Sequence, residues 1–400
     1  MTDLMIASFN VKNLIGADEE YYRFERYTPE EYAWKQDWLA DQILTLNADV
    51  IGFQEIFDPK ALQAVIREAD LRGTALNDTV IPDRSKRYHR KAIFKRLAYG
   101  SYAKAGLAFA PNTNDGGPGE RRPGLAILSR VGFVGKPEVI QTLPTPAVIP
   151  FDELGGGDPG AAGYYRVTRL SRPILKVRIP LGDHVVTVFN CHLKSKLGEF
   201  PRDEDQPFPP EANLLEYDAT GRALGSVRAA LRRMAEAWVL RRAIVRELEA
   251  GYPVIVLGDL NDNEASVSTE VIAGEAPFKN YSWMRRHGAE RANDRYTDEE
   301  ATQIRDSIEK VRLQSAERLF VRKSQRDMVY TTAFGGVFES IDQILLSCHF
   351  HPDNPEAIAY LEYFSVLNDH LTDGSHAEAP YNKLASDHGQ IMAHLRLRDG

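Results

Sequence analysis

The chain has 400 residues, of which 43% are hydrophobic and 26% are charged. This composition is typical of a globular protein with a sizeable core, and it excludes a disordered or low-complexity chain. The formal net charge of −8 excludes a protein that coats nucleic acid with a uniformly basic surface, so a polyanionic substrate would have to meet a local basic region.

The cysteines and the first residues bear on the cellular compartment. Cys191 and Cys348 both lie in apolar runs, and we expect buried, reduced thiols there because the paired-cysteine pattern of a secreted scaffold is missing from the sequence. An apolar strand pattern begins almost at Met1, without a signal-peptide or membrane-spanning stretch. These features predict a cytoplasmic protein that does not span a membrane, and they indicate no protein partner.

The N-terminal part of the chain alternates strand and helix patterns. Residues 4–11, LMIASFNV, predict a strand that ends in polar residues, and residues 50–56, VIGFQEI, predict another. A helix is predicted between them, because Thr28 can cap it and Pro29 suits its first turn. A second helix is predicted over residues 59–71. The apolar face of the first helix is expected to contain Trp34, Trp38, Leu39, Ile43 and Leu46.

Residues 84–104 form a basic segment with eight Lys or Arg and no Asp or Glu. Aromatic residues are interleaved with these charges, and aromatic rings can stack on nucleic-acid bases. The segment is therefore interpreted either as a nucleic-acid contact or as a solvated basic face of an acidic protein. The interleaved rings are Tyr88, His89, Phe94, Tyr99 and Tyr102.

Two stretches in the middle of the chain are rich in Pro and Gly and predict loops, at residues 111–124 and 144–164. A strand, LAILSR, is predicted at residues 125–130. The runs at residues 172–179 and 184–195 predict a hairpin, because the turn sequence PLGD joins them.

The C-terminal half predicts a long helix over residues 222–249 and then a buried strand at 254–259. A further helix is predicted over residues 297–320, and two strands, at 340–347 and 389–397, close the chain. Irregular alternation with hairpins favours mixed or antiparallel sheets covered by helices over a doubly wound nucleotide-binding fold. We expect one domain over residues 1–400, with insertions near 74–124, 144–164, 198–220 and 274–326.

Polar residues of similar chemistry stand at the ends of several predicted strands. Each is weak evidence alone, because a single Asn or Asp at a strand end is usually a turn residue. Their joint occurrence is informative, because strand ends can converge on one rim of a sheet. The set consists of Asn10, Glu55, His192, Lys194, Asp259, Asn261, Asp342, Asp387 and His388.

The ordered motifs IASFNVKN, VIGFQEI, LAILSR, FNCHLKSK, VIVLGDLNDN, SIDQILLS and ASDHGQI resemble the endonuclease/exonuclease/phosphatase superfamily. The resemblance spans nearly the whole chain, from Asn10 to His388. It implies an α/β fold, a four-layer α-β-β-α sandwich of two mixed, mostly antiparallel sheets. It also implies divalent-metal-dependent cleavage of phosphoester bonds, most similar to the bacterial nuclease-like members.

The resemblance implies a role for each matching residue. Glu55 is expected to be a direct metal ligand, while Asn10 and Asp387 add oxygen ligands or orient metal-bound water. Ligation by oxygen alone suits Mg²⁺ or Mn²⁺. Asp259 would orient or deprotonate the attacking water, and Asn261 would hold a phosphate oxygen.

Two histidines are expected to act at phosphorus. His192 would donate to the transition-state phosphate, and His388 would act as base or as cationic stabiliser, with Asp342 fixing its tautomer. Whether Asp259 or His388 takes the proton is left open by the sequence. Lys194 and Arg130 are interpreted either as phosphate contacts or as solvated surface residues.

The sequence departs from the family pattern before Asp342, where many relatives have an arginine or an aromatic residue and this chain has Ser340 and Ile341. The signature of the inositol-phosphatase branch is also absent. We therefore predict a Mg²⁺-dependent nuclease or phosphodiesterase, with DNA as the first substrate hypothesis and RNA as the second, and with Arg87, Arg90 and Lys91 as substrate contacts. The alternatives are a hydrolase of a small-molecule or lipid phosphate, and a catalytically silent binding protein of the same fold.

Overall fold

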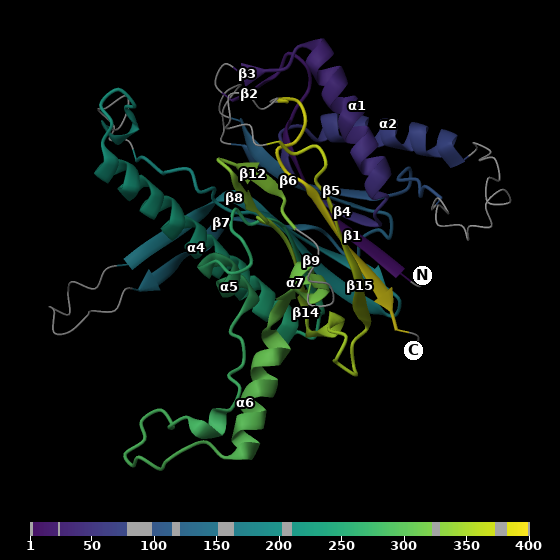
Figure 1. Cartoon of the computed structure of the whole chain (residues 1–400). Helices are drawn as coiled ribbons and strands as arrows, with labels where there is room; N and C mark the ends of the chain where they lie inside the picture. The colour runs from purple at the N-terminus through teal and green to yellow at the C-terminus, as the bar shows by residue number, and fades with distance from the viewer. Residues whose placement is uncertain are drawn as a thin grey trace.

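The computed structural model describes residues 3–22, 25–77, 98–113, 121–150, 164–201, 210–321, 329–372 and 382–398. Two six-stranded sheets face each other, and helices cover their outer faces (Figure 1). Each sheet is mixed, with a parallel pair at its centre and antiparallel neighbours on both sides. This arrangement confirms the predicted α-β-β-α sandwich.

The first sheet joins strands from the two ends of the chain, and its parallel pair is β1 with β4. Its strands, in spatial order, are β15 (Ala359–Leu367), β16 (Gln390–Leu397), β1 (Asp3–Leu14), β4 (Val50–Ile56), β6 (Arg121–Ser129) and β5 (Gly106–Thr113).

The second sheet has β9 and β10 as its parallel pair. Its strands, in spatial order, are β11 (Leu313–Ser315), β14 (Asp342–Ser347), β10 (Val254–Asp259), β9 (His184–His192), β8 (Tyr164–Leu181) and β7 (Glu138–Pro150). Two short ribbons stand apart from both sheets, β2 (Glu20–Tyr22) with β3 (Glu25–Arg26) and β12 (Thr332–Phe334) with β13 (Val337–Glu339).

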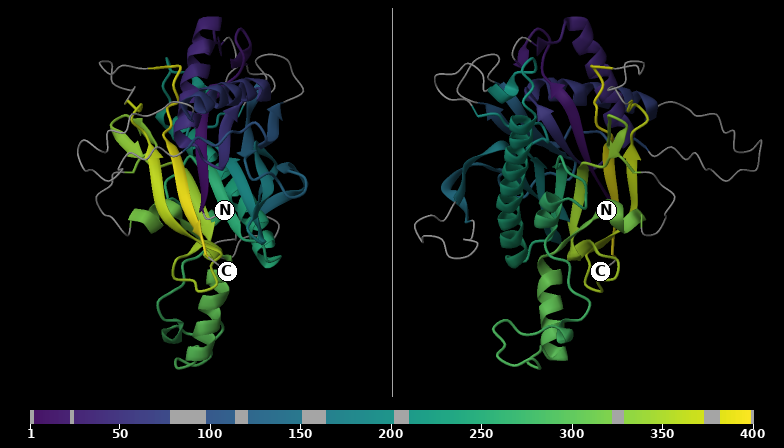
Figure 2. Two further views of the ribbon diagram at one scale, coloured as in Figure 1. Left: turned by 90° about the vertical axis from the view of Figure 1, so that its right-hand side faces the viewer. Right: turned by 60° about the vertical axis from the view of Figure 1, so that its left-hand side comes forward.

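Helices α1 (Pro29–Leu46) and α2 (Pro59–Asn77) pack on the outer face of the first sheet, through residues such as Ile43 and Val65. Helices α4 (Ala219–Glu249) and α5 (Val267–Ala273) pack on the outer face of the second sheet. Helix α6 (Asp298–Val311) extends away from the sandwich, as both views of Figure 2 show, and it contacts η2 (Tyr281–Trp283). The other helices within the described ranges are α7 (Ala316–Val321), η1 (Pro210–Ala212) and η3 (Cys348–Phe350).

The central core lies between the sheets and contains aliphatic residues from the inner faces, such as Ile6 of β1 and Leu257 of β10. The sheets approach closely at Gly52, where a Cβ atom would lie 2.0 Å from Leu257 Cδ1. A polar bridge also joins them, because Gln54 Nε2 donates to Asn190 Oδ1 at 2.7 Å. The inner faces are therefore held at a fixed separation just below the strand ends that carry the polar motifs.

Several sequence expectations are corrected by the structure. Residues 144–150 belong to β7 rather than to a loop. In the stretch 111–124, residues 111–113 belong to β5 and residues 121–124 belong to β6. The helix expected over 297–320 is interrupted by β11, because Leu313–Ser315 pairs with β14. Strand β15 was not predicted.

Helix α1 begins with the expected cap, a full capping box between Thr28 and Glu31. Its apolar face differs from the prediction, because Trp34 is 41% exposed whereas Lys35 is fully buried. Cys191 is buried as predicted and Cys348 is partly buried, and both thiols are free. Across the part of the chain that the structure covers, no helix combines the length and the apolar character required to cross a bilayer.

Candidate active site

The period-2 alternation of the strands directs the polar motif residues into the space between the sheets. On β1, Ile6 faces the central core, so Asn10 points the same way. On β10, Leu257 faces that core, and Asp259 follows two residues later. Gly258 lies between them with φ +140°, and a Cβ there would lie 1.9 Å from the Cys191 carbonyl oxygen, so the strand requires glycine at this position.

The neighbouring strands of the second sheet supply two more side chains by the same alternation. His192 ends β9 and pairs in register with Asp259, while Asp342 begins β14 and pairs with Asp259 from the other side. All three side chains are almost completely buried. Backbone register, rather than loop conformation, therefore brings these three motifs together.

Asp259 is the centre of the site. Its Oδ2 accepts a hydrogen bond from Asn10 Nδ2 at 3.1 Å and lies 3.3 Å from His192 Nε2 and 3.8 Å from His388 Nε2. Its Oδ1 accepts from the backbone N–H of Asn261 at 2.8 Å. Three segments that are distant in sequence therefore converge on one carboxylate.

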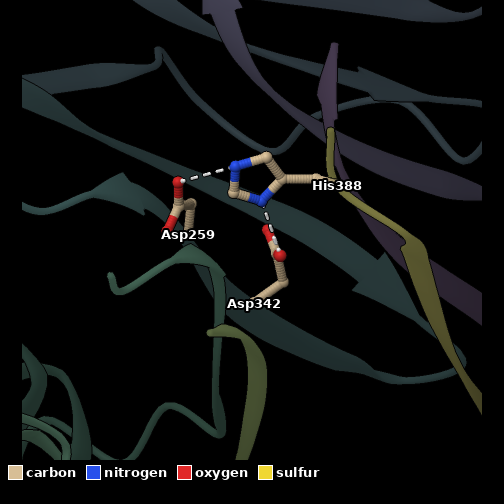
Figure 3. Close-up of side chains that lie close together, drawn as sticks. All are labelled: Asp259, Asp342 and His388. Atoms are coloured by element: carbon tan, nitrogen blue, oxygen red, sulfur yellow. Dashed lines mark hydrogen bonds and ion pairs between the residues drawn. The ribbon is translucent and has the colours of Figure 1, made fainter. Parts of the chain in front are cut away.

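His388 lies between two carboxylates, with its Nδ1 2.9 Å from Asp342 Oδ2 and its Nε2 facing Asp259 (Figure 3). Ser386 fixes its backbone, because the Ser386 hydroxyl donates to the Asn10 carbonyl at 2.6 Å and accepts from His388 N–H at 3.0 Å. The loop that carries His388 is thus attached directly to the end of β1.

The surroundings give the two histidines opposite protonation preferences. Burial alone would lower the pKa of His388, but the carboxylates of Asp342 and Asp259 outweigh it and raise the pKa well above its usual value. Burial, with Arg172 nearby, lowers the pKa of His192 well below its usual value. Burial raises the pKa of Asp259 to about 7, against the opposing charge of His388. At neutral pH, His388 is therefore a cation and His192 is neutral.

Donor atoms of Asp259, Asp342 and His388 lie within 4.8 Å of one another, a spacing that could hold a metal ion. Both ring nitrogens of His388 already face a carboxylate, however, and the imidazole occupies the space between the two acids. The geometry therefore fits a carboxylate–imidazole–carboxylate relay better than a metal cluster.

Glu55 reaches the site through a break in β4. Phe53 packs on the outer helices and Gln54 points inward, so simple alternation would direct Glu55 outward. Its φ of +64° and a register shift between Gln54 and Ile56 mark a bulge that reorients the side chain. Glu55 Oε1 then lies 3.4 Å from Asn10 Nδ2, at the edge of the site.

A hard divalent cation takes oxygen ligands, and the carboxylate of Glu55 can supply them. Its Oε2 accepts from Asn13 N–H at 3.0 Å, and Asn13 Oδ1 is buried with no hydrogen-bond partner within the described ranges. Asp387 is exposed nearby and lies 3.8 Å from Lys12 Nζ. The residues present therefore fit a divalent cation held by oxygen alone at Glu55.

The polar residues at the end of β10 and after it fall into two groups, one at the site and one in structural contacts. Asp259 and Asn261 belong to the site, and Asn261 donates from Nδ2 to the Leu193 carbonyl at 3.0 Å. Asp262 instead forms an ion pair with Arg233 at 2.6 Å on the α4 side, and Asn263 Oδ1 accepts from the Ala265 N–H at the start of α5. Only part of the cluster is therefore available for chemistry.

The family model described as Endonuclease/Exonuclease/phosphatase family matches residues 7–388, the same span over which these motifs meet in space. The chain belongs to the endonuclease/exonuclease/phosphatase family. Members of this family are hydrolases of phosphoester bonds and generally depend on a divalent metal. The predicted family and enzyme class are therefore confirmed.

Solved structures of the family align with the chain at low identity. A family protein from Bacteroides thetaiotaomicron covers 99% of this chain and 98% of its own, with 13% identity and a TM-score of 0.44. A mannosyl-6-phosphatase from the same organism gives 14% identity, coverages of 98% and 99%, and a TM-score of 0.43. The human nocturnin catalytic domain gives 13% identity and a TM-score of 0.43, and the alignment covers 99% of this chain and 95% of that domain. A search of curated proteins gave no match.

Not every residue that the sequence predicted as a substrate contact lies at the site. Arg130 follows β6, whose end pairs with the start of β4 at Val50, whereas Glu55 is at the other end of β4. The guanidinium donates to Asn47 Oδ1 and to the Gly100 carbonyl, both at 2.6 Å. The structure contradicts Arg130 as a phosphate contact, because this side chain is a structural clamp far along the strand.

The ammonium of Lys194 is not brought to the site either. Lys194 directs its ammonium to its own loop, where Nζ donates to the Leu197 carbonyl at 2.8 Å. Tyr99 and Tyr102 are buried in the core and are not available for stacking on a base, which corrects that interpretation. Arg87, Arg90 and Lys91, with the other rings of the basic segment up to Phe94, lie outside the described residues.

Arg172 is a cation beside His192 that the sequence did not predict as a site residue. It lies on β8 and donates from Nη1 to the Leu193 carbonyl at 3.0 Å, directly beside His192. Its charge contributes to lowering the pKa of both His192 and Lys194. An arginine just before a proline in an otherwise apolar run, RPILKV, is the sequence signal that could have indicated it.

Proposed function

We propose that the protein hydrolyses phosphodiester bonds with Mg²⁺ or Mn²⁺ at Glu55. The observation that carries the proposal is the convergence of Asn10, His192 and His388 on the Asp259 carboxylate, with Glu55 in contact with the same Asn10 amide. Hydrolysis of a phosphodiester requires an activated water, neutralised phosphate charge and a stabilised leaving oxygen. In this arrangement Asp259 would activate the water, and His388 together with the ion at Glu55 would offset the negative charge of the phosphate.

Glu55 would be the direct metal ligand, with Asn10 and Asp387 as further oxygen ligands or as partners of metal-bound water. When bound, the ion would act as a Lewis acid at a phosphoryl oxygen. Oxygen donors favour Mg²⁺ or Mn²⁺ over zinc. Asn10 would also hold Asp259 in place, because its Nδ2 donates to Asp259 Oδ2.

The side chains of the second sheet and the His388 loop would carry the proton and charge chemistry. Asp259 would take the proton of the attacking water, because a base with a pKa of about 7 is matched to neutral pH. His388, kept charged by Asp342, would stabilise negative charge on the phosphate. His192 would donate to the transition-state phosphate, and Asn261 would hold one of its oxygens.

Nucleic acid, and DNA in particular, is the proposed substrate. Residues 84–104 supply a local excess of eight cations in a chain of net charge −8, and Arg172 lies next to His192. The discriminating experiment compares plasmid, linear double- and single-stranded DNA, RNA and a generic phosphodiester dye with Mg²⁺ or Mn²⁺. Cleavage of plasmid would indicate endonuclease action, whereas loss of linear DNA alone would indicate exonuclease action.

The basic segment can be tested separately. Neutralising Arg87, Arg90 and Lys91 together should weaken DNA binding and reduce the slope of log K against log salt, because fewer counterions are released. An unchanged slope would make the segment a solvated surface.

A lipid or other partly apolar phosphate is the second candidate substrate, favoured by one observation. The β12–β13 hairpin exposes Phe334 (72%), Val337 (55%) and Phe338 (53%). Its base is attached to the site, because Thr331 Oγ1 accepts the backbone N–H of Asp342 at 3.2 Å. Hydrolysis of a phospholipid in the same panel, with all nucleic acids left intact, would favour this alternative.

A further inference from the structure

Strands β1 and β4 are interrupted at the same level of the first sheet. They pair in parallel register up to Asn10 and Gln54, and resume pairing at Leu14 and Ile56. Between these points Asn13, on β1, has a φ of +55°, in the left-handed region. Glu55 has a φ of +64° on β4. Strained backbone of this kind in two adjacent strands is characteristic of functional sites.

The two interruptions face each other through Asn13 and Glu55. The Asn13 N–H donates to Glu55 Oε2 at 3.0 Å, so the Asn13 backbone is fixed against the carboxylate. The Asn13 side-chain oxygen, Oδ1, is shielded from solvent and has no hydrogen-bond partner among the residues that the structure describes. A buried amide oxygen is normally satisfied, so this one has an acceptor position open to a ligand such as a cation.

We propose that Asn13 Oδ1 is an additional oxygen ligand of the divalent ion at Glu55. The inference rests on the proposed function, because it assumes an ion at that carboxylate. An amide oxygen is a suitable ligand for a hard cation and adds no charge to the site. The interruptions of β1 and β4 would then be explained, because they bring Asn13 into contact with the Glu55 carboxylate.

A simpler explanation is that position 13 requires only a residue that tolerates a left-handed backbone, as asparagine does. That explains the residue type, but it does not explain a buried oxygen without a partner. The two explanations make different predictions for two substitutions. Asn13→Gly keeps the backbone freedom and removes the oxygen, whereas Asn13→Asp keeps an oxygen and adds a negative charge.

The experiment is a titration of the metal-free full-length protein with Mn²⁺, followed by isothermal calorimetry and by the electron paramagnetic resonance signal of free Mn²⁺. We expect Asn13→Gly to weaken Mn²⁺ binding by at least about tenfold and Asn13→Asp to strengthen it. The matched control is Asn47→Gly, a change at another left-handed asparagine (φ +44°) that caps α1 and contacts Arg130. It should leave the affinity for Mn²⁺ unchanged.

The outcomes separate this inference from the function on which it rests. Wild-type affinity in Asn13→Gly would overturn the ligand role of Asn13 while leaving an ion at Glu55. If Asn13→Gly does not fold, as judged by circular dichroism, Asn13→Asp decides, and unchanged or weaker Mn²⁺ binding there would overturn the inference. A wild-type protein that binds no Mn²⁺ would overturn the metal role of Glu55 and, with it, that of Asn13.

Discussion

His388 Nδ1 lies 2.9 Å from Asp342 Oδ2, and the two side chains are only 12% and 1% exposed. A charged imidazole would not persist in such a buried position without a carboxylate partner, because burial penalises the cation. Asp342 is thus the group that maintains a positive charge on His388, next to Asp259. The predictions below follow from this relationship and from the contacts around Asp259.

Asp342→Asn should destabilise the protein in a pH-dependent way. The pKa of His388 in the folded protein is raised above its unfolded value of about 6.5, so the pair contributes its full stability below that pH. The contribution is lost as pH rises through the raised pKa. Urea unfolding of wild type and variant should therefore differ most near pH 6 and converge at alkaline pH. A difference that is constant with pH would contradict the charged state of His388.

Asp259→Asn should lower kcat by about 10²-fold or more, the scale of one positioned acid–base group. The amide preserves the shape of the side chain but cannot accept the proton of the attacking water. His388→Ala should have an effect of similar size through loss of the cation. Steady-state kinetics on a phosphodiester dye would measure both, and a near-normal rate would remove the substituted residue from the proposed mechanism.

Arg172 and Arg130 should respond in opposite ways to replacement by glutamine. Arg172 lies beside His192, so Arg172→Gln should reduce kcat/KM by about 10-fold or more, the scale of a lost charge-assisted hydrogen bond. Arg130→Gln should leave kcat/KM unchanged and lower the melting temperature, because Arg130 joins Asn47 to Gly100 away from the site. The reverse pattern in paired kinetic and thermal measurements would contradict both placements.

Lys35 should make the stability of the protein increase with pH. This fully buried lysine donates from Nζ to the carbonyls of Val11 and Leu384, both at 3.0 Å, and thereby connects β1 to the His388 loop. Burial lowers its pKa to about 7, whereas the unfolded value is about 10.4. Between these values the unfolded chain binds more protons, so stability rises with pH.

Lys35→Met removes this titration and the two hydrogen bonds. The free energy of unfolding of wild type, measured in urea from pH 7 to pH 10, should rise relative to that of Lys35→Met. A parallel pH dependence in the two proteins would show that Lys35 keeps its ordinary pKa in the fold.

Much of the site could be predicted from the sequence because its residues lie on regular strands. Asn10, His192 and Asp259 follow apolar runs and Asp342 begins one, and period-2 alternation fixes the face on which they lie. Glu55 could not be placed by alternation, since its bulge reverses the direction that the pattern gives. Its assignment came from the family motif alone.

Other features depend on tertiary contacts that a linear pattern does not encode. Lys35 occupies a position that helical periodicity would assign to an apolar residue, and only the carbonyls of two distant segments explain its burial. Arg130 carries the charge that a phosphate contact requires, yet it donates to the carbonyls of Asn47 and Gly100 and to Asn47 Oδ1, at the opposite end of the strands. Residues 297–320 are helical in pattern, but the edge of the second sheet captures Leu313–Ser315 as a strand.

The most direct test of the account is the hydrolysis rate of a generic phosphodiester by wild type and by Glu55→Gln, each in excess chelator and after addition of Mg²⁺ or Mn²⁺. The account predicts that chelation abolishes turnover by wild type, that either ion restores it, and that Glu55→Gln is not restored under the same conditions. Undiminished turnover of wild type in chelator, or full activity of Glu55→Gln, would contradict it.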